Sequence, residues 1–273
     1  MNVFSPDSST DKDIKILQIS DMHLFASPEQ QLVGVNTEES FLSVLKLAQH
    51  ASWPPDLIFL TGDLSQDGSE VSYLRLIEHL SKLNIPCYVL PGNHDTPKAL
   101  SHAFNEGQVL YRPFVHHQQW LFAFLDSETP GEEGGTLKEE EITRLSQEIE
   151  RHPDKKVLIC LHHQLIPVGS QWLDTMTVAN PDSLLKLIRT HTNIAGIIHG
   201  HVHQEFNSFV ENCPIYATPS TCFQFTPQSE DFAIDNIAPG YRWLRLSPEG
   251  NIETRVIRLD SAPDSLEKNS IGY

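Results

Sequence analysis

The sequence predicts a layered α/β sandwich. Short apolar runs rich in Ile, Leu and Val alternate with segments whose apolar residues recur at helical spacing. After His203 the helical patterns give way to strand-like runs. With 273 residues, 39% of them hydrophobic, the chain can bury a large core. Because no repeat, low-complexity segment or clear linker interrupts it, we expect one domain over residues 1–273, with antiparallel strands added by residues 204–260 and a polar, frayed tail from about residue 261.

The strands expected in the first part of the chain are short, apolar and sharply bounded, which is typical of buried strands. They cover residues 14–20, 56–61, 87–90, 156–161 and 194–198. Helical patterns separate them at residues 41–51, 69–83, 138–151 and 181–190. Later strands are expected at residues 214–218, 241–246 and 252–259.

The charge balance excludes some partners. The chain has 19 Lys and Arg residues against 36 Asp and Glu, a formal charge of −17, which disfavours sequence-independent binding to nucleic acid. No stretch approaches the roughly 20 apolar residues of a membrane span, so we expect no membrane partner. Residues 1–7 lack the basic region and apolar run of a secretory signal, and the four cysteines form no C-x-x-C pair. These features predict a cytoplasmic protein with reduced thiols, and they carry no information on its oligomeric state.

Side chains with oxygen or nitrogen donor atoms follow the five early strands. They are Asp21, His23, Asp63, Asn93, His162, His201 and His203. If the strands lie in one sheet, these side chains converge at the carboxyl edge, where α/β sheets bind ligands. A histidine or a Gly-Asp pair alone is common in loops, so the prediction depends on the whole set.

Divalent cations would stabilise such a cluster, because a buried unpaired charge costs several kcal/mol. The donors are oxygen and nitrogen only, which suits Mn, Fe(II) or Zn. Seven ligands exceed the four of a tetrahedral ion, so two ions sharing a carboxylate are expected. Asp63 is the best bridge, since Gly62 allows the backbone to come close.

The motifs D-x-H, G-D, G-N-H-D, a strand-end His and G-H-x-H occur in the order found in the calcineurin-like metallophosphoesterases, and the chain resembles that family. Further segments resemble a narrower branch, the bacterial class III cyclic-AMP phosphodiesterases. They lie at residues 23–25, 34–37, 172–174, 217–225 and 238–242. The similarity extends from about residue 14 to residue 259.

The resemblance implies an α/β/β/α sandwich with mixed sheets and two divalent ions, Fe and/or Mn. The first ion would be held by Asp21, His23, Asp63 and His203, and the second by Asp63, Asn93, His162 and His201. A bridging hydroxide would hydrolyse a small cyclic nucleotide, 3′,5′-cyclic AMP, to 5′-AMP. His94 would be the catalytic residue, facing the phosphate and giving a proton to the leaving oxygen, with His23, Asp63 and Asn93 also contacting substrate.

Several neighbouring residues have less definite roles. We expect His163 to support the ligands from behind and His199 to pack beneath them, while Asp67 or Asp95 could orient His94 or a ligand imidazole. Aromatic residues could stack on adenine, with core packing as the alternative for each. They are Trp172, Phe223, Phe225, Tyr241 and Trp243, of which Phe223 is the first candidate.

Two other functions fit parts of this pattern. A broad phosphoesterase acting on other cyclic nucleotides or phosphate esters would use the same metal site, and only the branch-specific segments favour cyclic AMP. A non-catalytic interaction protein on the same scaffold should have lost a ligand or the phosphate-facing histidine, and none is missing. The acidic charge balance disfavours a nuclease.

Overall fold

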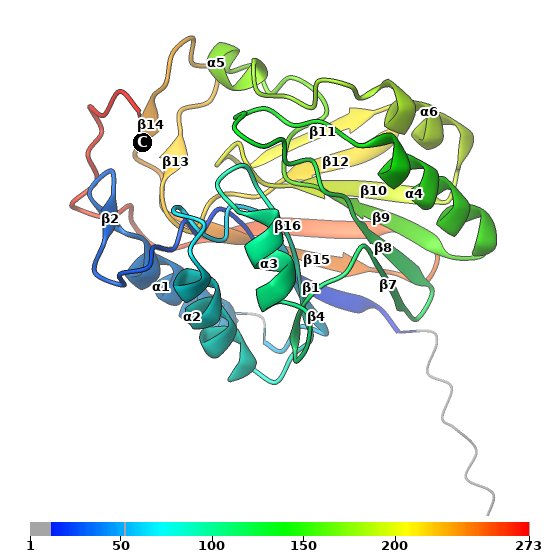
Figure 1. Ribbon diagram of the computed structural model, residues 1–273, viewed down its shortest axis with the longest axis horizontal. Coiled ribbons are helices and arrows are strands. Elements are labelled where there is room, and N and C mark those ends of the chain that lie inside the picture. The colour runs from blue at the N-terminus through cyan, green and yellow to red at the C-terminus, as the bar shows by residue number, and fades with distance from the viewer. Residues whose placement is uncertain (1–11, 52, 273) are drawn as a thin grey trace, which may run out of the picture.

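The computed structural model describes residues 12–51 and 53–272 (Figure 1), so residues 1–7, discussed above, lie outside the described residues. Two six-stranded sheets form the centre of the molecule. The first has the order β16-β15-β1-β4-β5-β6 and the second the order β11-β12-β10-β9-β8-β7. Two small two-stranded sheets, β2-β3 and β13-β14, complete the strands of the described residues.

The strands of the first sheet are β1 (Ile14–Ile19), β4 (Leu57–Thr61), β5 (Cys87–Leu90), β6 (Val109–Tyr111), β15 (Gly240–Leu246) and β16 (Ile252–Arg258). Those of the second are β7 (Phe114–His117), β8 (Trp120–Phe124), β9 (Lys156–Cys160), β10 (Ile194–His199), β11 (Phe206–Val210) and β12 (Cys213–Ala217). The short strands are β2 (Gln31–Leu32), β3 (Val35–Asn36), β13 (Gln224–Phe225) and β14 (Ile234–Asp235). The helices are α1 (Thr37–Ala51), α2 (Glu70–Ser81), α3 (Pro97–Ala103), α4 (Glu139–Arg151), α5 (Gln171–Asp174) and α6 (Asp182–Thr190).

Helices cover the outer face of each sheet, as Figure 1 shows. Apolar side chains of α1, α2 and α3, such as Phe41, Leu76 and Leu100, pack on the first sheet. Ile142 and Leu184 belong to the packing of α4 and α6 on the second sheet. The predicted α/β/β/α sandwich with mixed sheets is confirmed.

A third apolar core lies between the two sheets. Its centre is the ring of Phe59 on β4, which meets the rings of Phe122 and Phe124 on β8 edge to face, with centroids 4.9 and 5.0 Å apart. This geometry is favourable for aromatic pairs. The two sheets are thereby held face to face over their length.

The strands that precede the candidate site residues do not all lie in one sheet. β1, β4 and β5 belong to the first sheet and β9 and β10 to the second, and β6, β7 and β8 intervene in the chain. Within each sheet these strands pair in parallel, so their carboxyl ends reach one edge. At the C-terminal end of the chain, β15 and β16 join the first sheet antiparallel, whereas β12 runs antiparallel to β11 and parallel to β10.

The expectation of a frayed tail is also wrong for the part that the structure describes. Leu266 is buried against the apolar cluster that includes Val33 and Phe223. The backbone N–H of Glu267 donates to the Val33 carbonyl oxygen at 2.9 Å. One apolar side chain in a polar segment is therefore enough to attach the tail to the β2-β3 hairpin.

The structure also bears on the cysteines and on membrane-spanning helices. All four cysteines are free and buried. Cys87 and Cys160 lie inside apolar runs of the sequence, and the core thiols expected at these two positions are confirmed. Over residues 12–51 and 53–272, none of the helices combines the length and apolar character needed to cross a bilayer.

Candidate metal centre

All eight predicted site residues come together where strands of both sheets end. Asp21 and His23 follow β1, Asp63 follows β4, Asn93 and His94 follow β5, His162 follows β9, and His201 and His203 follow β10. Five of their side chains are at most 1% exposed: Asp21, His23, Asp63, His162 and His203. His201 is also buried, with 4% exposed. The convergence does not need a single sheet, because the parallel strands of both sheets end at the same side of the sandwich.

Two groups of donor atoms lie side by side in this cluster. In the first, His203 Nε2 lies 3.1 Å from His23 Nε2 and 3.6 Å from Asp21 Oδ1. In the second, Asn93 Oδ1 lies 3.1 Å from His162 Nε2 and 3.0 Å from His201 Nδ1.

Asp63 connects the two groups of donor atoms. Its Oδ2 lies 3.8 Å from His23 Nε2 and 3.3 Å from His162 Nε2. Asp63 therefore has the position that a carboxylate shared by two ions would need.

The backbone at these strand ends is strained. Five of the candidate ligands have left-handed φ angles: Asp21 at 55°, His23 at 50°, Asp63 at 48°, His201 at 67° and His203 at 46°. Such a conformation costs a non-glycine residue of the order of 1–3 kcal/mol and is common at functional sites. The strained turns aim successive side chains of a D-x-H or H-x-H motif at one point.

Two glycines allow the close approach of these loops. A Cβ atom on Gly62, which has a φ of 94°, would lie 2.2 Å from His162 Nδ1. A Cβ atom on Gly92 would lie 2.2 Å from Asp63 Oδ1. Any side chain at either position would therefore displace a candidate ligand.

The outer nitrogens of three imidazoles are held by oxygen acceptors. His23 Nδ1 lies 2.6 Å from Gln66 Oε1, His162 Nδ1 lies 2.8 Å from the Thr61 carbonyl oxygen, and His203 Nδ1 lies 2.9 Å from the Phe223 carbonyl oxygen. An acceptor at Nδ1 places the proton there and leaves the Nε2 lone pair free for a metal. The three Nε2 lone pairs face the interior of the cluster, where they repel one another unless a cation or a proton lies between them.

The buried charges fit a cation as well. Asp21 Oδ2 and Asp63 Oδ2 are buried, and neither finds a hydrogen-bond donor in the described part of the chain. Burial raises the pKa of Asp21 to about 7, which reflects the cost of an uncompensated carboxylate there. Burial lowers the pKa of His23 to about 3, so its imidazole is the neutral form that binds metals. Oxygen and nitrogen donors of this kind suit Mn, Fe or Zn.

His162 and Asp63 form the most strongly coupled pair. Burial would raise the pKa of Asp63, but the imidazoles of His162 and His94 outweigh burial and hold that pKa well below its usual range. The Asp63 carboxylate likewise overcomes the effect of burial on His162 and raises its pKa to about 9. A proton on His162 thus compensates the Asp63 charge, and a metal ion would replace that proton.

Two supporting histidines lie where they were expected. His163 lies behind His201, with Nδ1 2.8 Å from Ser127 Oγ and Nε2 3.1 Å from the Glu133 carbonyl oxygen. His199 is fully buried, and its Nδ1 lies 2.9 Å from the carbonyl oxygen of Gly200. Both positions agree with a supporting role and place neither residue among the donor atoms described above.

Asp67 and Asp95 both hold loops of the site in place. Asp95 accepts hydrogen bonds from the backbone N–H groups of Leu64, Ser65 and Gly92 and from the Tyr73 hydroxyl at 2.9–3.1 Å. It thereby ties the loop after β4 to the loop after β5. Asp67 accepts from the Ala26 N–H at 2.8 Å and from the Ser69 N–H at 3.1 Å. That either carboxylate also orients an imidazole stays a prediction.

Gln66 is the imidazole-orienting residue that the sequence analysis missed. It lies three positions after Asp63 in a loop, and no spacing rule distinguishes it from an ordinary polar loop residue. Only its 2.6 Å contact with His23 Nδ1 shows what it does.

Gln66→Ala should weaken metal binding at the His23 end of the site. Loss of the residue that hydrogen-bonds the non-coordinating nitrogen of a metal-binding histidine typically lowers metal affinity or activity by about 10- to 100-fold. We expect a loss of this size in titrations of activity against added Mn²⁺, with activity partly restored at high metal concentration. Gln108→Ala is the matched control, because Gln108 is a half-buried glutamine next to β6 whose side chain donates to Asn84 Oδ1 and not to a site residue. Unchanged metal dependence in Gln66→Ala would contradict the role.

The aromatic candidates separate into two groups. Trp172 and Phe225 line a cavity of about 200 Å³ together with Asn93, His94 and His201. Phe223 is only 1% exposed, and its ring packs against His203 with centroids 4.9 Å apart. The first candidate for stacking on adenine was therefore wrong, and the alternative of core packing is confirmed for Phe223.

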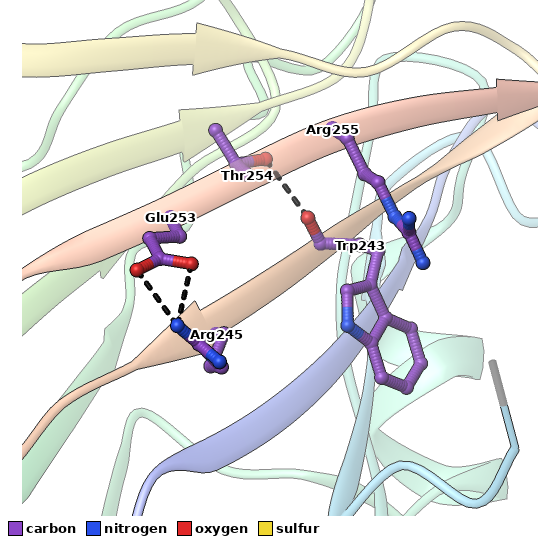
Figure 2. Close-up of a pocket in the computed structure, with 5 residues that line it drawn as sticks. All are labelled: Trp243, Arg245, Glu253, Thr254 and Arg255. Carbon is purple, nitrogen blue, oxygen red and sulfur yellow. Dashed lines mark hydrogen bonds and ion pairs between the residues drawn. The ribbon is translucent and has the colours of Figure 1, made fainter.

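Tyr241 and Trp243 also lie away from this cavity. Tyr241 is fully buried in the core beneath the first sheet. Trp243 lines a separate pocket on β15 and β16, beside the Arg245–Glu253 ion pair (Figure 2).

Comparison with known proteins agrees with this arrangement. The calcineurin-like phosphoesterase family model matches residues 14–205. The chain is 38% identical to the Vibrio vulnificus protein named 3′,5′-cyclic adenosine monophosphate phosphodiesterase CpdA, over 98% of each chain. It is 36% identical to the Escherichia coli K12 protein of the same name, over 95% of each. A dimetal phosphatase from Danio rerio has a similar fold, with a TM-score of 0.60 at 14% identity over 91% of this chain and 99% of the other. The chain belongs to the calcineurin-like phosphoesterase family.

Proposed function

We propose that this protein hydrolyses 3′,5′-cyclic AMP to 5′-AMP at a site for two divalent metal ions. The observation that carries the proposal is the pair of donor groups joined by Asp63, with buried carboxylate oxygens and imidazole lone pairs directed at common points. The names of the full-length relatives support the choice of cyclic AMP among phosphodiesters.

We assign one ion to Asp21, His23, Asp63 and His203 and the other to Asp63, Asn93, His162 and His201. The donor set favours Fe and/or Mn. When bound, two such ions supply Lewis-acid activation of water and of the phosphoryl oxygens, together with positive charge that a protein of formal charge −17 otherwise lacks.

We propose that His94 acts on the leaving group. Its backbone N–H donates to Asp63 Oδ1 at 3.0 Å, which fixes the residue beside the bridging carboxylate. Its half-buried ring meets the His23 ring edge to face, with centroids 5.1 Å apart, and lines the cavity next to the metal centre. Water attacks phosphorus, the bond from phosphorus to the ribose 3′ oxygen breaks, and His94 delivers a proton to that oxygen. Asn93, His23 and Asp63 position the phosphate.

Substrate comparison tests this function against a broader phosphoesterase activity. We expect kcat/KM for 3′,5′-cyclic AMP to exceed the values for 2′,3′-cyclic nucleotides and p-nitrophenyl phosphate by at least about 100-fold, a difference that corresponds to roughly 3 kcal/mol in transition-state binding. Equal values for all of these substrates would favour the broader activity. Cyclic AMP as a small intracellular substrate agrees with the cytoplasmic location that we propose.

Removal of metal should abolish the activity reversibly. Dialysis against a chelator removes the proposed ions, and we expect turnover of cyclic AMP to fall below about 1% and to return on addition of Mn²⁺ or Fe²⁺. Metal analysis of the active protein should give close to two equivalents per chain. Full activity in a metal-stripped sample would contradict the proposal.

A further inference from the structure

The cavity beside the metal centre has two chemically different sets of lining residues. Three are polar residues that belong to the proposed site, namely Asn93, His94 and His201. Five are apolar, namely Trp172, Leu173, Met176, Phe225 and Phe232, and Glu133 and Gly272 complete the lining. This apolar group, which we call the aromatic wall, has no part in the chemistry described above.

The aromatic wall is held in place by contacts between its rings. Trp172 meets Phe225 at a centroid distance of 4.8 Å and an interplanar angle of 86°, and it meets Phe232 at 5.2 Å and 64°. Phe225 is 1% exposed, and its ring stacks on the imidazole of His203 at 4.4 Å and 18°. The wall is therefore packed directly against one of the proposed metal ligands, so a group lying on it is held at a fixed distance from the reacting phosphate.

The wall is built from segments far apart in the sequence. Trp172 lies on α5, Phe225 on β13, and Phe232 in the loop between β13 and β14. Figure 1 shows α5, β13 and β14 gathered at one end of the molecule. The two β segments pair with each other, Phe225 opposite Ile234, which fixes the loop that carries Phe232.

We propose that the aromatic wall is the binding site for the purine base of the substrate and that it favours adenine over guanine; this inference rests on the proposed phosphodiesterase function. A flat base stacks well on aromatic side chains, and the half-buried rings of Trp172 and Phe232 are the ones it would contact. The buried ring of Phe225 packs against both and supports them. The wall offers few polar groups, so guanine, with its carbonyl oxygen and additional N–H groups, would lose more hydrogen bonds to water on entering it.

Trp172→Ala tests the inference with two substrates that differ only in the base. Removing one stacking contact should lower kcat/KM for cyclic AMP by about 5- to 150-fold, mainly through KM. The same variant should hydrolyse the base-free analogue, 1-deoxyribose 3,5-cyclic phosphate, within about twofold of the wild-type rate. Wild-type protein should prefer cyclic AMP to cyclic GMP.

The matched control is Trp243→Ala, because Trp243 is a half-buried tryptophan in a different pocket (Figure 2). We expect it to leave both substrates unaffected. An equal loss on both substrates in Trp172→Ala would show that the residue supports the metal centre instead of the base, and no loss on either would place the base elsewhere. If Trp172→Ala does not fold by circular dichroism, Phe232→Ala carries the same prediction.

Calorimetric titration with adenosine separates this inference from the proposed function. Adenosine has no phosphate, so its binding does not depend on hydrolysis. Suppose that the protein does not hydrolyse cyclic AMP, that it binds adenosine, and that Trp172→Ala loses this binding. The proposed function would then be overturned, whereas the base site would be supported. Hydrolysis of cyclic AMP that is insensitive to Trp172→Ala would overturn the base site alone.

Discussion

Asp63→Asn should lower kcat/KM for cyclic AMP by about 1,000-fold or more and reduce the bound metal from near two equivalents to one or fewer. A shared carboxylate contributes to both ions, and loss of several kcal/mol of charge stabilisation corresponds to several decades in rate. The asparagine amide also presents N–H donors toward a cation in place of one carboxylate oxygen. Mass-spectrometric metal analysis and steady-state kinetics on the same sample measure both effects.

The control for this change is Asp67→Asn, in the same loop. Asp67 accepts hydrogen bonds from backbone N–H groups and lies outside the two donor groups. It should therefore retain both metal equivalents and most of the activity. An Asp63→Asn protein with two equivalents of metal and wild-type turnover would rule out a bridging carboxylate at position 63.

His94→Ala should lower kcat by about 100- to 10,000-fold, the usual contribution of a positioned general acid, while metal content stays unchanged. The loss should depend on the leaving group. Cyclic AMP leaves a basic alkoxide that needs a proton, whereas p-nitrophenolate leaves without one, so a p-nitrophenyl phosphodiester should be hydrolysed by the variant with a much smaller loss. Single-turnover rates on both substrates separate the two contributions.

His102→Ala in α3 is the matched control, since it removes an exposed imidazole eight positions along the chain. It should have no effect on either substrate. If His94→Ala lost activity equally on cyclic AMP and on the p-nitrophenyl phosphodiester, His94 would position the phosphate and would not supply the proton.

The strand ends and the residues that follow them could be predicted because their signals are local. A buried strand such as residues 57–61 is recognisable from five consecutive apolar or small residues, and Gly62 and Asp63 come directly after it. Parallel strands bring such ends to one edge by geometry alone. The candidate site was therefore specified without knowledge of how the strands are ordered.

The division into two sheets could not be predicted from the same signals. A fully apolar strand has the same pattern whether its neighbour is β4 or β8, and the choice depends on contacts across the whole chain. β7 and β8 were missed because residues 114–124 are interrupted by polar residues at the turn between them.

The partners of the imidazoles were hidden for a different reason. His162 and His203 are oriented by the backbone carbonyl oxygens of Thr61 and Phe223, which carry no sequence signal because every residue has one. The attachment of the tail was missed for another reason. The segment around Leu266 is polar in composition and so predicts fraying, although the single apolar side chain of Leu266 packs in a buried cluster.

The rings of Phe59, Phe122 and Phe124 between the two sheets have a consequence for how this enzyme can change over evolution. Each of the two donor groups takes residues from both sheets, with Asp21 and His203 in one group and Asn93 and His162 in the other. The thickness of that interior therefore sets the distances between ligands within each group. Interiors transmit changes in volume because they are close-packed. Natural variants should therefore replace these rings only in compensating combinations that preserve the total side-chain volume. A single large-to-small replacement among them should weaken cation affinity, although none of the three rings belongs to either donor group.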